Sequence, residues 1–547
     1  MGYFTLVKTR NPRPPRYWSK RLPAELQDTR WDAVVIGSGI GGMTTAALMA
    51  RLGQKVLVLE QHYVPGGFTH VFSRKGYTWD VGVHAVGEVT THSLSGRLLK
   101  DLTRGELEWA PLGEVYDEFY WPGGFRIDFP DTPEKFRDNL IAAFPNEVEA
   151  IDTYLRHVRE VGGHMKGYYL ARIVPEMAST PAEWLFARKA REWFERSTQE
   201  VIDELTDDPQ LKAVFAAQWG YYGSLPHRSS FAIQALVVRH FLWGGYYPVG
   251  GSAEIARGLL HTVADAGGWT RVVASVDQIL VEDDRAVGVR LADGEEIRAE
   301  KVVSAAGIVA TLRRLLPEQI RGQDWVTEAL EGVAPASAHL CLYIGFKGDI
   351  TKAGASAANK WFYRVWSSDD DAWMVAPEQE EFERALCLYC SFPSLKDPEH
   401  DPGPELRHTG EVVTFVPWEA FERWSGTAWR KRGDDYLAFK QRLQDALLED
   451  FLSDMPQLRG YIDYVELSTP LSTEYFCRPM SGSIYGIEPT PERFANDRLK
   501  PRCPIGDLYF SGSEVTTVGV MGAMMGGVLA AAAAEPWGVF HHVRKLM

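Results

Sequence analysis

Three glycines near the N-terminus, Gly37, Gly39 and Gly42, are spaced as Gly-x-Gly-x-x-Gly. The first permits a tight turn after a strand, the second lets a pyrophosphate approach the backbone, and the third lets a helix pack closely on the strand. The helix then presents free N–H groups and the positive end of its dipole to the phosphates. The spacing predicts a dinucleotide site that also includes Ser38 and Gly41.

An acid follows at the distance that such a site requires. Glu60 closes a second apolar run and is followed by Gln61, and its carboxylate can accept hydrogen bonds from ribose hydroxyls. An acid at this position disfavours a 2′-phosphate, so we expect FAD or NAD rather than NADP. A glycine turn with a purely structural role is the alternative interpretation.

Further glycine-bearing turns favour FAD, the longer cofactor. Gly66-Gly67-Phe68-Thr69 follows soon after the acid, and "LYFSGSEV" near the C-terminus predicts a strand followed by Gly512 and Glu514. Glu514 is expected to hydrogen-bond the ribityl chain. The N–H groups around Val520 and Met521 are expected to face the flavin edge that becomes negative on reduction. A solvated glutamate beside a packed helix is the alternative.

Two other residues are candidates for catalysis. His84 could transfer a proton beside the flavin, or it could simply pack beneath the cofactor. Tyr485, in "GSIYG", is expected to line a substrate tunnel. Cys387 and Cys390 match CxxC, but the apolar run "ALCLYCSF" predicts a buried strand with the two thiols on opposite faces, so we expect no metal site. Zinc or redox chemistry at these thiols is the alternative.

The elements that must position these residues follow an α/β order. Residues 31–36 and 55–59 predict strands on either side of a helix over 42–52, which is a right-handed parallel unit. The pattern over 135–245 is helical, and 269–306 is rich in strands. Further strands are expected at 337–346, at 385–392, at 411–416 and in "DLYFSG".

The amino-acid composition limits the classes of protein to which this chain can belong. With 547 residues, 45% apolar and 24% charged, the chain predicts a folded protein of two domains. Its net charge of −15 disfavours nucleic-acid binding. Five cysteines and no evident signal peptide favour a cytoplasmic location. The uncharged stretch 515–534 is long enough to span a bilayer, but its many Gly, Ala and Thr residues favour a buried helix.

The sequence resembles the FAD-dependent phytoene desaturase-like oxidoreductases, within them the branch of carotenoid isomerases and retinol saturases. The similar segments include "VVIGSGIGGMTTAALMARLGQKVLVLEQHYVPGG", "YTWDVGVHAVG", "YYPVGGSAEIARGL", "SFPSLKDPEHDPG", "STPLSTEYF" and "LYFSGSEVTTVGVMGAMMGG". The resemblance implies an α/β fold with a Rossmann-type, amine-oxidase-like FAD-binding domain and a substrate domain of mixed sheet and helices. It implies that Val276 lies on the strand whose backbone holds the adenine, and that Ala306 and Gly307 border the cofactor.

The domain boundaries expected from this resemblance are as follows. Residues 1–29 form a leader; 30–110, 248–330 and 500–547 form the FAD-binding domain; 111–247 and 331–499 form the helical and mixed-sheet parts of the substrate domain. Two positions depart from the family pattern. Glu514 stands where Asp is more usual, which lengthens its reach, and Phe68 stands where many relatives carry Arg.

The family acts on C=C bonds of long apolar polyenes, so the resemblance implies saturation or cis–trans isomerisation of a retinoid- or carotenoid-like substrate through flavin N5. A desaturase that passes electrons to quinone or oxygen is the alternative, and a non-catalytic FAD-containing lipid-binding protein is a third possibility. Because only one dinucleotide fingerprint is present, electrons must be exchanged with an external donor or acceptor.

A polyene substrate raises the question of membrane contact. The segment "EWLFARKAREWFERS" places Trp184, Phe186, Trp193 and Phe194 among basic residues, a pattern typical of a helix that lies in the plane of a membrane. The sequence thus predicts peripheral, monotopic contact at the cytoplasmic face. A helix whose aromatic side chains pack on the domain beneath it is the alternative.

Overall fold

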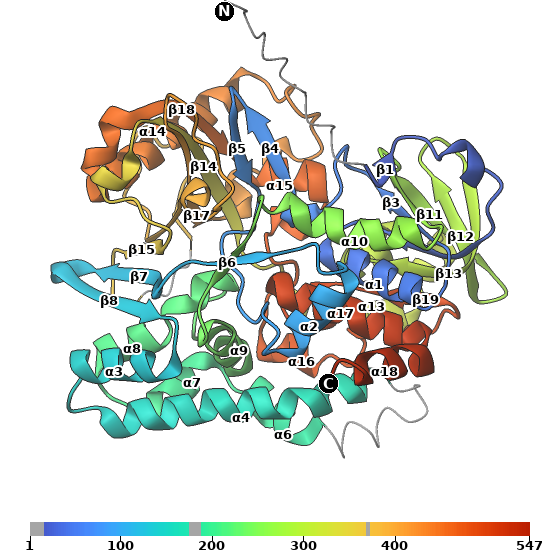
Figure 1. Ribbon diagram of the computed structural model, residues 1–547, viewed down its shortest axis with the longest axis horizontal. Helices are drawn as coiled ribbons and strands as arrows, with labels where there is room; N and C mark the ends of the chain where they lie inside the picture. The colour runs from blue at the N-terminus through green and yellow to red at the C-terminus, as the bar shows by residue number, and fades with distance from the viewer. Residues whose placement is uncertain (1–15, 174–186, 368–371) are drawn as a thin grey trace, which may run out of the picture.

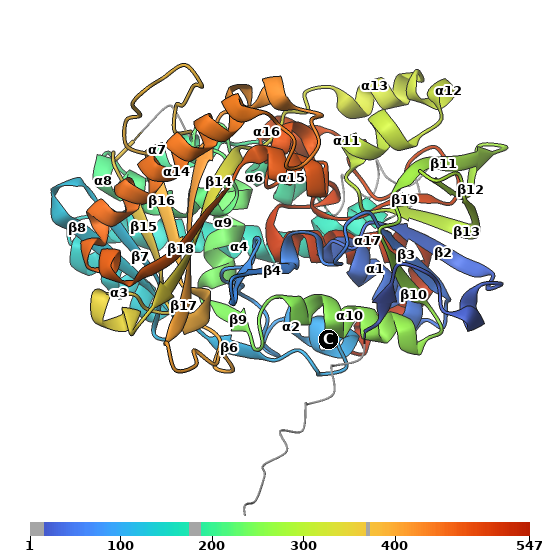
Figure 2. The same ribbon diagram turned by 90° about the horizontal axis from the view of Figure 1, so that it is seen from above.

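Two large sheets organise the molecule, as seen in the computed structural model, which describes residues 16–173, 187–367 and 372–547 (Figure 1). The first sheet has eight strands and the second has seven. Figure 2 shows the first sheet on the right of the molecule and the second on the left. Two short pairs, β4 (Val71–Arg74) with β5 (Tyr77–Asp80) and β6 (Trp109–Pro111) with β9 (Tyr246–Pro248), complete the strands.

The first sheet is parallel at its centre. In spatial order its strands are β1 (Trp18–Ser19), β10 (Trp269–Val272), β3 (Val56–Glu60), β2 (Trp31–Ile36), β13 (Glu296–Ser304), β12 (Arg285–Leu291) and β11 (Val276–Glu282), and β19 (Leu508–Phe510) also pairs with β13. The two pairings among β11, β12 and β13 are antiparallel. The central strands β2 and β3 are continuous apolar runs because helices cover both of their faces. The predicted strands 31–36 and 55–59 are confirmed.

The helix after β2 begins earlier than expected. It is α1 (Ile40–Arg51), and Gly39 is its N-cap, so the helix starts inside the glycine loop rather than after it. On the same face of the sheet α1 packs against α10 (Ala253–Asp265) and α17 (Gly519–Ala534) in one apolar core. The opposite face packs against α11 (Ile308–Ala310), α12 (Glu318–Arg321) and α13 (Asp324–Leu330).

The two ends of the chain meet in this domain. Figure 1 shows the blue helix α1 beside the red helix α17, and Thr45 Oγ1 donates a hydrogen bond to the carbonyl of Gly527 at 3.0 Å. Helix α17 is largely buried, which confirms the prediction for the uncharged stretch 515–534. Across the described residues, every helix is too short or too polar to cross a membrane.

The second sheet is mixed. Its strands, in spatial order, are β18 (Ile462–Ser468), β14 (Ala338–Lys347), β17 (Arg407–Val416), β16 (Cys387–Ser391), β15 (Asn359–Tyr363), β7 (Val115–Trp121) and β8 (Phe125–Pro130). One face packs on α14 (Asp434–Asp454). The other packs on the helical layer, α3 (Pro133–Ala143), α4 (Val148–Ile173), α6 (Arg188–Phe194), α7 (Thr198–Asp203), α8 (Pro209–Phe215) and α9 (Phe231–Phe241).

The positions of the two cysteines on strand β16 show which interpretation of the CxxC motif is correct. Cys387 belongs to the core on the helical face of the sheet, whereas Cys390 belongs to the core beneath α14. The predicted strand with thiols on opposite faces is confirmed, because side chains three positions apart in a strand point in opposite directions. The two sulfurs therefore cannot bind one ion together.

Candidate active site

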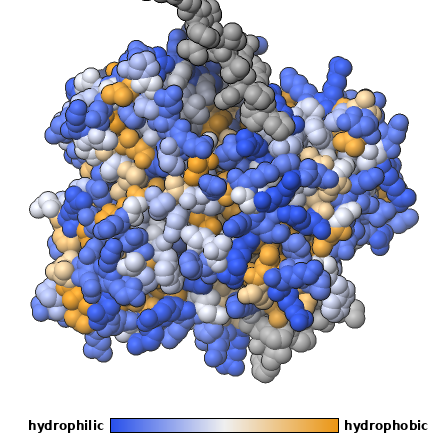
Figure 3. Space-filling view, viewed as in Figure 1, coloured by the Kyte–Doolittle hydropathy of each residue, from blue (hydrophilic) through white to orange (hydrophobic). Residues whose placement is uncertain are grey.

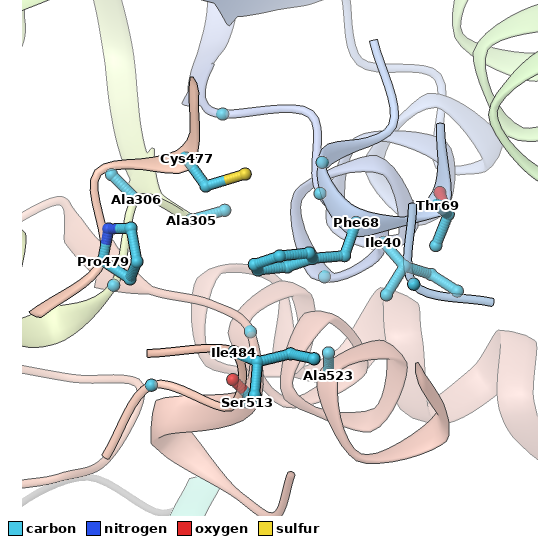
Figure 4. Close-up of a pocket in the computed structure, with 18 of the residues that line it drawn as sticks. Ile40, Phe68, Thr69, Ala305, Ala306, Cys477, Pro479, Ile484, Ser513 and Ala523 are labelled. Atoms are coloured by element: carbon cyan, nitrogen blue, oxygen red, sulfur yellow. The ribbon is translucent and has the colours of Figure 1, made fainter. Parts of the chain in front are cut away.

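A continuous cavity of about 460 Å³ lies between the two sheets. Residues from the N-terminal loops, from the segment after β13 and from the C-terminal part of the chain border it. Figure 4 shows the ring of Phe68 projecting into it toward Cys477 and Pro479, with Ala305 and Ala306 on the far side. Loops that are far apart in sequence thus close around one space.

The glycine loop forms the floor of this cavity. A Cβ on Gly42 would overlap the carbonyl oxygen of Gly37, and a Cβ on Gly41 would lie 2.6 Å from the Cα of Gly512. At Gly39, in contrast, a Cβ would have nothing within 4 Å. The glycine loop is therefore tightly packed on the side that faces the protein and open on the side that faces the cavity. A backbone that lies against a phosphate must have this arrangement.

Two helices point their N-termini at this cavity. The N-cap residues of α1 and α17, Gly39 and Val518, provide no side-chain hydrogen bond to the first turn. Gly41 and Gly42 of α1 and Val520 and Ala523 of α17 line the cavity. The free N–H groups and dipole ends of the two helices suit a diphosphate at α1 and an anionic ring edge at α17.

The carboxylate of Glu60 is held at the cavity edge. Its Oε2 accepts hydrogen bonds from Ser38 N at 2.9 Å and Ser38 Oγ at 2.6 Å, and its Oε1 accepts one from His62 N at 2.7 Å. Ser38 does not itself line the cavity, and its hydroxyl also accepts a hydrogen bond from Gly66 N at 3.0 Å. Ser38 thus fixes both Glu60 and the second glycine turn.

Glu514 lines the cavity but is engaged with the protein backbone. Its Oε2 accepts hydrogen bonds from Ile308 N at 2.5 Å and Val309 N at 3.2 Å, at the start of α11. Burial raises its pKa, against the effect of these donors and of the nearby Arg493 guanidinium. In the described structure, Glu514 therefore ties the C-terminal loop to the segment after β13.

The other residues expected at the cofactor line the same cavity, apart from Met521, which is buried in the core of the first domain. They are Gly37, Gly39, Gly41, Gly42, Glu60, Gln61, Gly66, Gly67, Phe68, Thr69, Val276, Ala306, Gly307, Gly512, Glu514 and Val520. His84 and Tyr485 line it too. A tight glycine floor, two open helix ends and an acid on the cavity wall together fit FAD.

Comparison with known families gives an independent result. The model of the flavin containing amine oxidoreductase family matches residues 40–534. The chain belongs to this family. Its cofactor is FAD, as the further glycine-bearing turns predicted. The expected α/β fold with an FAD-binding and a substrate domain is confirmed.

Similarity to individual proteins indicates which branch the chain resembles. All-trans-retinol 13,14-reductases of Danio rerio and Rattus norvegicus are each 32% identical, covering 94% of this chain and 86% of theirs. A chloroplastic prolycopene isomerase of Daucus carota is 26% identical, over 90% and 79%. These matches confirm the resemblance to the carotenoid isomerase and retinol saturase branch.

Solved structures support the fold alone. Cyclohexylamine oxidase from Brevibacterium oxydans has a TM-score of 0.59 at 16% identity and covers 94% of this chain and 100% of that one. Putrescine oxidase bound to putrescine has a TM-score of 0.60 at 15% identity, over 93% and 99%. The two-domain architecture is therefore shared with enzymes whose sequences have diverged widely.

The part of the cavity away from the glycine floor is aromatic. Trp361 and Tyr389 of the second sheet lie with ring centroids 4.5 Å apart, and Tyr221 and Phe415 continue this wall. Tyr485 also lines it, and its hydroxyl donates a hydrogen bond to the carbonyl of Gly220 at 3.1 Å. Such a surface suits a flat, apolar ligand.

His84 lies on the cavity wall beside these aromatic residues. Its Nδ1 is 2.7 Å from Glu411 Oε2, and its ring packs edge-on to Tyr389 at 5.2 Å. Burial, aided by the positive charge of Lys396, lowers the pKa of His84 to about 3. Burial raises the pKa of Glu411 to about 8. At neutral pH the ring is therefore uncharged and the carboxyl protonated.

Sequence reasoning missed the charged residues behind His84. Glu411, Asp80, Asp117 and Lys396 are each at most 3% exposed. The first three stand inside apolar strand sequences such as "HTGEVVTFV" and "YTWD". A lone acid in a strand predicted to be buried was the available signal, because ionisable groups are rarely buried without a partner.

The described residues do not support the in-plane membrane helix. Phe194 is buried in the core, and Trp193 packs against Phe231 with ring centroids 5.5 Å apart. Trp184 and Phe186 lie outside the described residues. On the face drawn in Figure 3, polar side chains predominate and apolar ones form small separate groups.

Proposed function

We propose that this protein is an FAD-dependent oxidoreductase that saturates or isomerises a C=C bond of a long apolar isoprenoid polyene, retinoid- or carotenoid-like. One observation carries the proposal: the cavity runs without interruption from the glycine floor to the aromatic wall. An apolar chain lying on that wall would reach the cofactor. Relatives named as retinol reductases and prolycopene isomerases support the same substrate class.

When bound, FAD supplies hydride transfer at its N5 position. The residues of this chain then have three tasks. The aromatic wall binds and orients the polyene by packing against it, and at the same time excludes water. The helix ends and glycine loop fix the cofactor. His84 faces the shared cavity and is the titratable side chain positioned to exchange a proton with the substrate.

Similarity alone does not decide catalytic competence. One relative at 29% identity is named an inactive all-trans-retinol 13,14-reductase. The experiment is to reduce the FAD-loaded protein anaerobically, add all-trans-retinol or prolycopene, and analyse product mass and geometry. A gain of two hydrogens supports saturation, and changed geometry at constant mass supports isomerisation. If only oxidised protein reacts, and the substrate loses two hydrogens, the desaturase alternative is supported.

The electron partner and the location of the protein are further parts of the proposal. A separate donor or acceptor fits a chain with a single dinucleotide fingerprint. Peripheral contact at the cytoplasmic membrane face would deliver a water-insoluble polyene. A liposome flotation assay tests this: co-flotation supports it, whereas absence of binding with and without anionic lipid contradicts it.

A further inference from the structure

A group of buried ionisable side chains lies behind the cavity wall at His84. It brings together residues from five strands and from the loop after one of them. Its members are Asp80 at the end of β5, Asp117 on β7, Asn359 on β15, Ser391 on β16, Lys396 in the loop that follows β16, and Glu411 on β17. Groups of this kind cost folding free energy to bury, so their hydrogen bonds indicate what they do.

Lys396 is the fixed cation of this group. Its Nζ donates to the carbonyl of His84 at 2.7 Å, to Asn359 Oδ1 at 2.5 Å and to Ser391 Oγ at 2.7 Å. An ammonium has three N–H donors, and all three have an acceptor here. Burial lowers its pKa only to about 8, so it is mostly charged at neutral pH.

The acids of the group differ in what they contact. Asp80 accepts hydrogen bonds from Tyr247 and Ser252, and Asp117 accepts them from Tyr221 and Asn359. Glu411 instead uses one oxygen to accept from Asp80 N at 2.9 Å and turns the other toward the His84 ring. Asp117 reaches the cavity wall through Tyr221, whereas Glu411 is the acid of the group that contacts the His84 ring.

The contact between Glu411 and His84 requires a proton. Two unprotonated acceptors 2.7 Å apart would repel each other, so either Oε2 or Nδ1 must carry hydrogen. The two atoms are close but not aligned as a hydrogen bond, and neither has another hydrogen-bond partner among the described residues, so proton transfer between them needs a rotation of the ring or the carboxyl group. The raised pKa of Glu411 and the lowered pKa of His84 place it on Glu411. The neutral ring then carries its own hydrogen on Nε2, which has no hydrogen-bond partner among the described residues. The His84 side chain is 14% exposed and lines the cavity.

We propose that Glu411 and His84 form a proton relay that supplies the proton consumed when the substrate double bond is saturated, with Lys396 as its counter-charge. This inference rests on the proposed function. Saturation adds a hydride, which carries two electrons, to one carbon and a proton to its neighbour. Reduced FAD is the source of the hydride, and the relay is the source of the proton.

The atoms balance as follows. As the π bond breaks, the Nε2–H bond of His84 breaks and its proton bonds to the second carbon. The O–H bond of Glu411 breaks at the same time, and its proton bonds to Nδ1. The ring is neutral before and after, while Glu411 is left as a carboxylate near the Lys396 ammonium. A proton from water then bonds to Nε2 and the Nδ1 proton returns to Glu411, which restores both the acid and the starting tautomer.

Other titratable groups surround the pair and must be considered in its pH dependence. They are Asp80, Asp117, Lys396, His339 on β14, Cys341 and Tyr343 on β14, and Tyr389 on β16. Burial raises the pKa of both aspartates to about 6 and lowers that of His339 to about 4. Of the three carboxyl groups, that of Glu411 therefore releases its proton last.

Glu411→Gln separates the relay from a structural role. The amide oxygen can still accept from Asp80 N, and the amide N–H can donate to Nδ1, but no proton can be released. Glu466→Gln is the matched control, because Glu466 contacts Tyr464 on β18 and does not line the cavity. We expect both variants to bind FAD with the spectrum of the wild type.

The activity readout is anaerobic single turnover of reduced protein with all-trans-retinol in D₂O. We expect the wild type and Glu466→Gln to place two solvent deuteriums in the saturated product, one through the exchangeable N5–H of reduced flavin and one through the relay, and Glu411→Gln to react about 10²- to 10⁴-fold more slowly. Saturation by Glu411→Gln at the wild-type rate would overturn the relay while leaving the proposed function intact. A wild type that leaves the polyene unchanged would overturn the proposed function, and the relay with it; one that only isomerises it would overturn the relay alone.

The second readout needs no turnover. ¹⁵N NMR of the oxidised holoprotein, with the His84 resonances assigned by their loss in His84→Gln, reports which ring nitrogen carries hydrogen. In the wild type we expect hydrogen on Nε2 at neutral pH and on Nδ1 once Glu411 ionises near pH 8. In Glu411→Gln we expect Nε2–H throughout. The same tautomer in both proteins at every pH would overturn the proposal.

Discussion

The two halves of the cavity recognise their ligands by different means. At the glycine floor, the contacts come from backbone N–H groups and from the absence of side chains, as at Gly39 and Gly42. At the opposite wall, they come from large rings and from buried charges that converge from several strands. The first half suits a diphosphate, which all dinucleotides share; under the proposed function, the second half sets the shape of the site and the proton supply for one substrate class.

The largest effect is expected at Gly42, where the floor is tightest. In Gly42→Ala the new methyl group would overlap the carbonyl oxygen of Gly37 and lie 2.9 Å from the Cβ of Ala305. Both neighbours directly follow strands of the first sheet, β2 and β13, and are held to it by backbone hydrogen bonds, from Gly37 N to the carbonyl of Leu59 and from Ala305 N to the carbonyl of Ile36. We expect the free energy of unfolding to fall by about 3 kcal/mol or more, with loss of bound flavin. Chemical denaturation and the flavin absorbance of purified protein measure both.

Gly39→Ala is the matched comparison. Gly39 has φ −61° and ψ 164°, which alanine adopts freely, and its Cβ would enter open space. We expect the apoprotein to unfold at the wild-type denaturant concentration but to bind FAD about 100-fold more weakly, a loss of about 3 kcal/mol. Unchanged FAD affinity would mean that the diphosphate does not lie over this residue.

At the opposite wall, the burial of Glu411 is tested by the pH dependence of the free energy of unfolding. The pKa of Glu411 rises from 4.5 to about 8 on folding, so the folded chain holds a proton that the unfolded chain releases. Its contribution is complete below pH 4.5 and is lost as the pH rises through 8. Relative to Glu411→Gln, the wild type should lose a free energy of unfolding on the order of a few kcal/mol over this range. Parallel pH profiles for the two proteins would contradict the burial of an ionisable group here.

The smallest effect is expected at Tyr485. Tyr485→Phe removes one hydrogen bond, from the hydroxyl to the carbonyl of Gly220. We expect the unfolding free energy to fall by about 1 kcal/mol, with FAD affinity and the rate of the chemical step unchanged. Stopped-flow measurement of the reaction checks this. A rate reduced 100-fold or more would make Tyr485 a participant in the chemistry rather than part of the wall.

The same contrast explains which parts of the fold and of the site could be predicted from the sequence. The cofactor half depends on local rules, since a glycine spacing, an acid at the end of a strand and a helix start each occur within a few residues. The predicted loop, strands and FAD followed from these rules. The first turn of α1 was placed two residues too late because Gly39 serves as an N-cap despite lacking a side chain.

The substrate half depends on long-range contacts that a single sequence does not encode locally. Glu411 and His84 are separated by more than three hundred residues, and the packing of β5, which precedes His84, against β17 brings them together. His84 was identified as a candidate, but its partner was not. Glu514, expected at the ribityl chain, lines the cavity and also accepts two backbone hydrogen bonds from α11, and its contact with the ribityl chain stays a prediction.

The most direct test of the whole account is the mass and geometry of a polyene after one anaerobic turnover. The protein is loaded with FAD, reduced, mixed with all-trans-retinol or prolycopene, and the extract is analysed by chromatography and mass spectrometry. The account predicts either a product two hydrogens heavier, formed as the flavin is oxidised, or a geometric isomer formed while the flavin stays reduced. Recovery of both polyenes unchanged from correctly folded, flavin-loaded protein would contradict it.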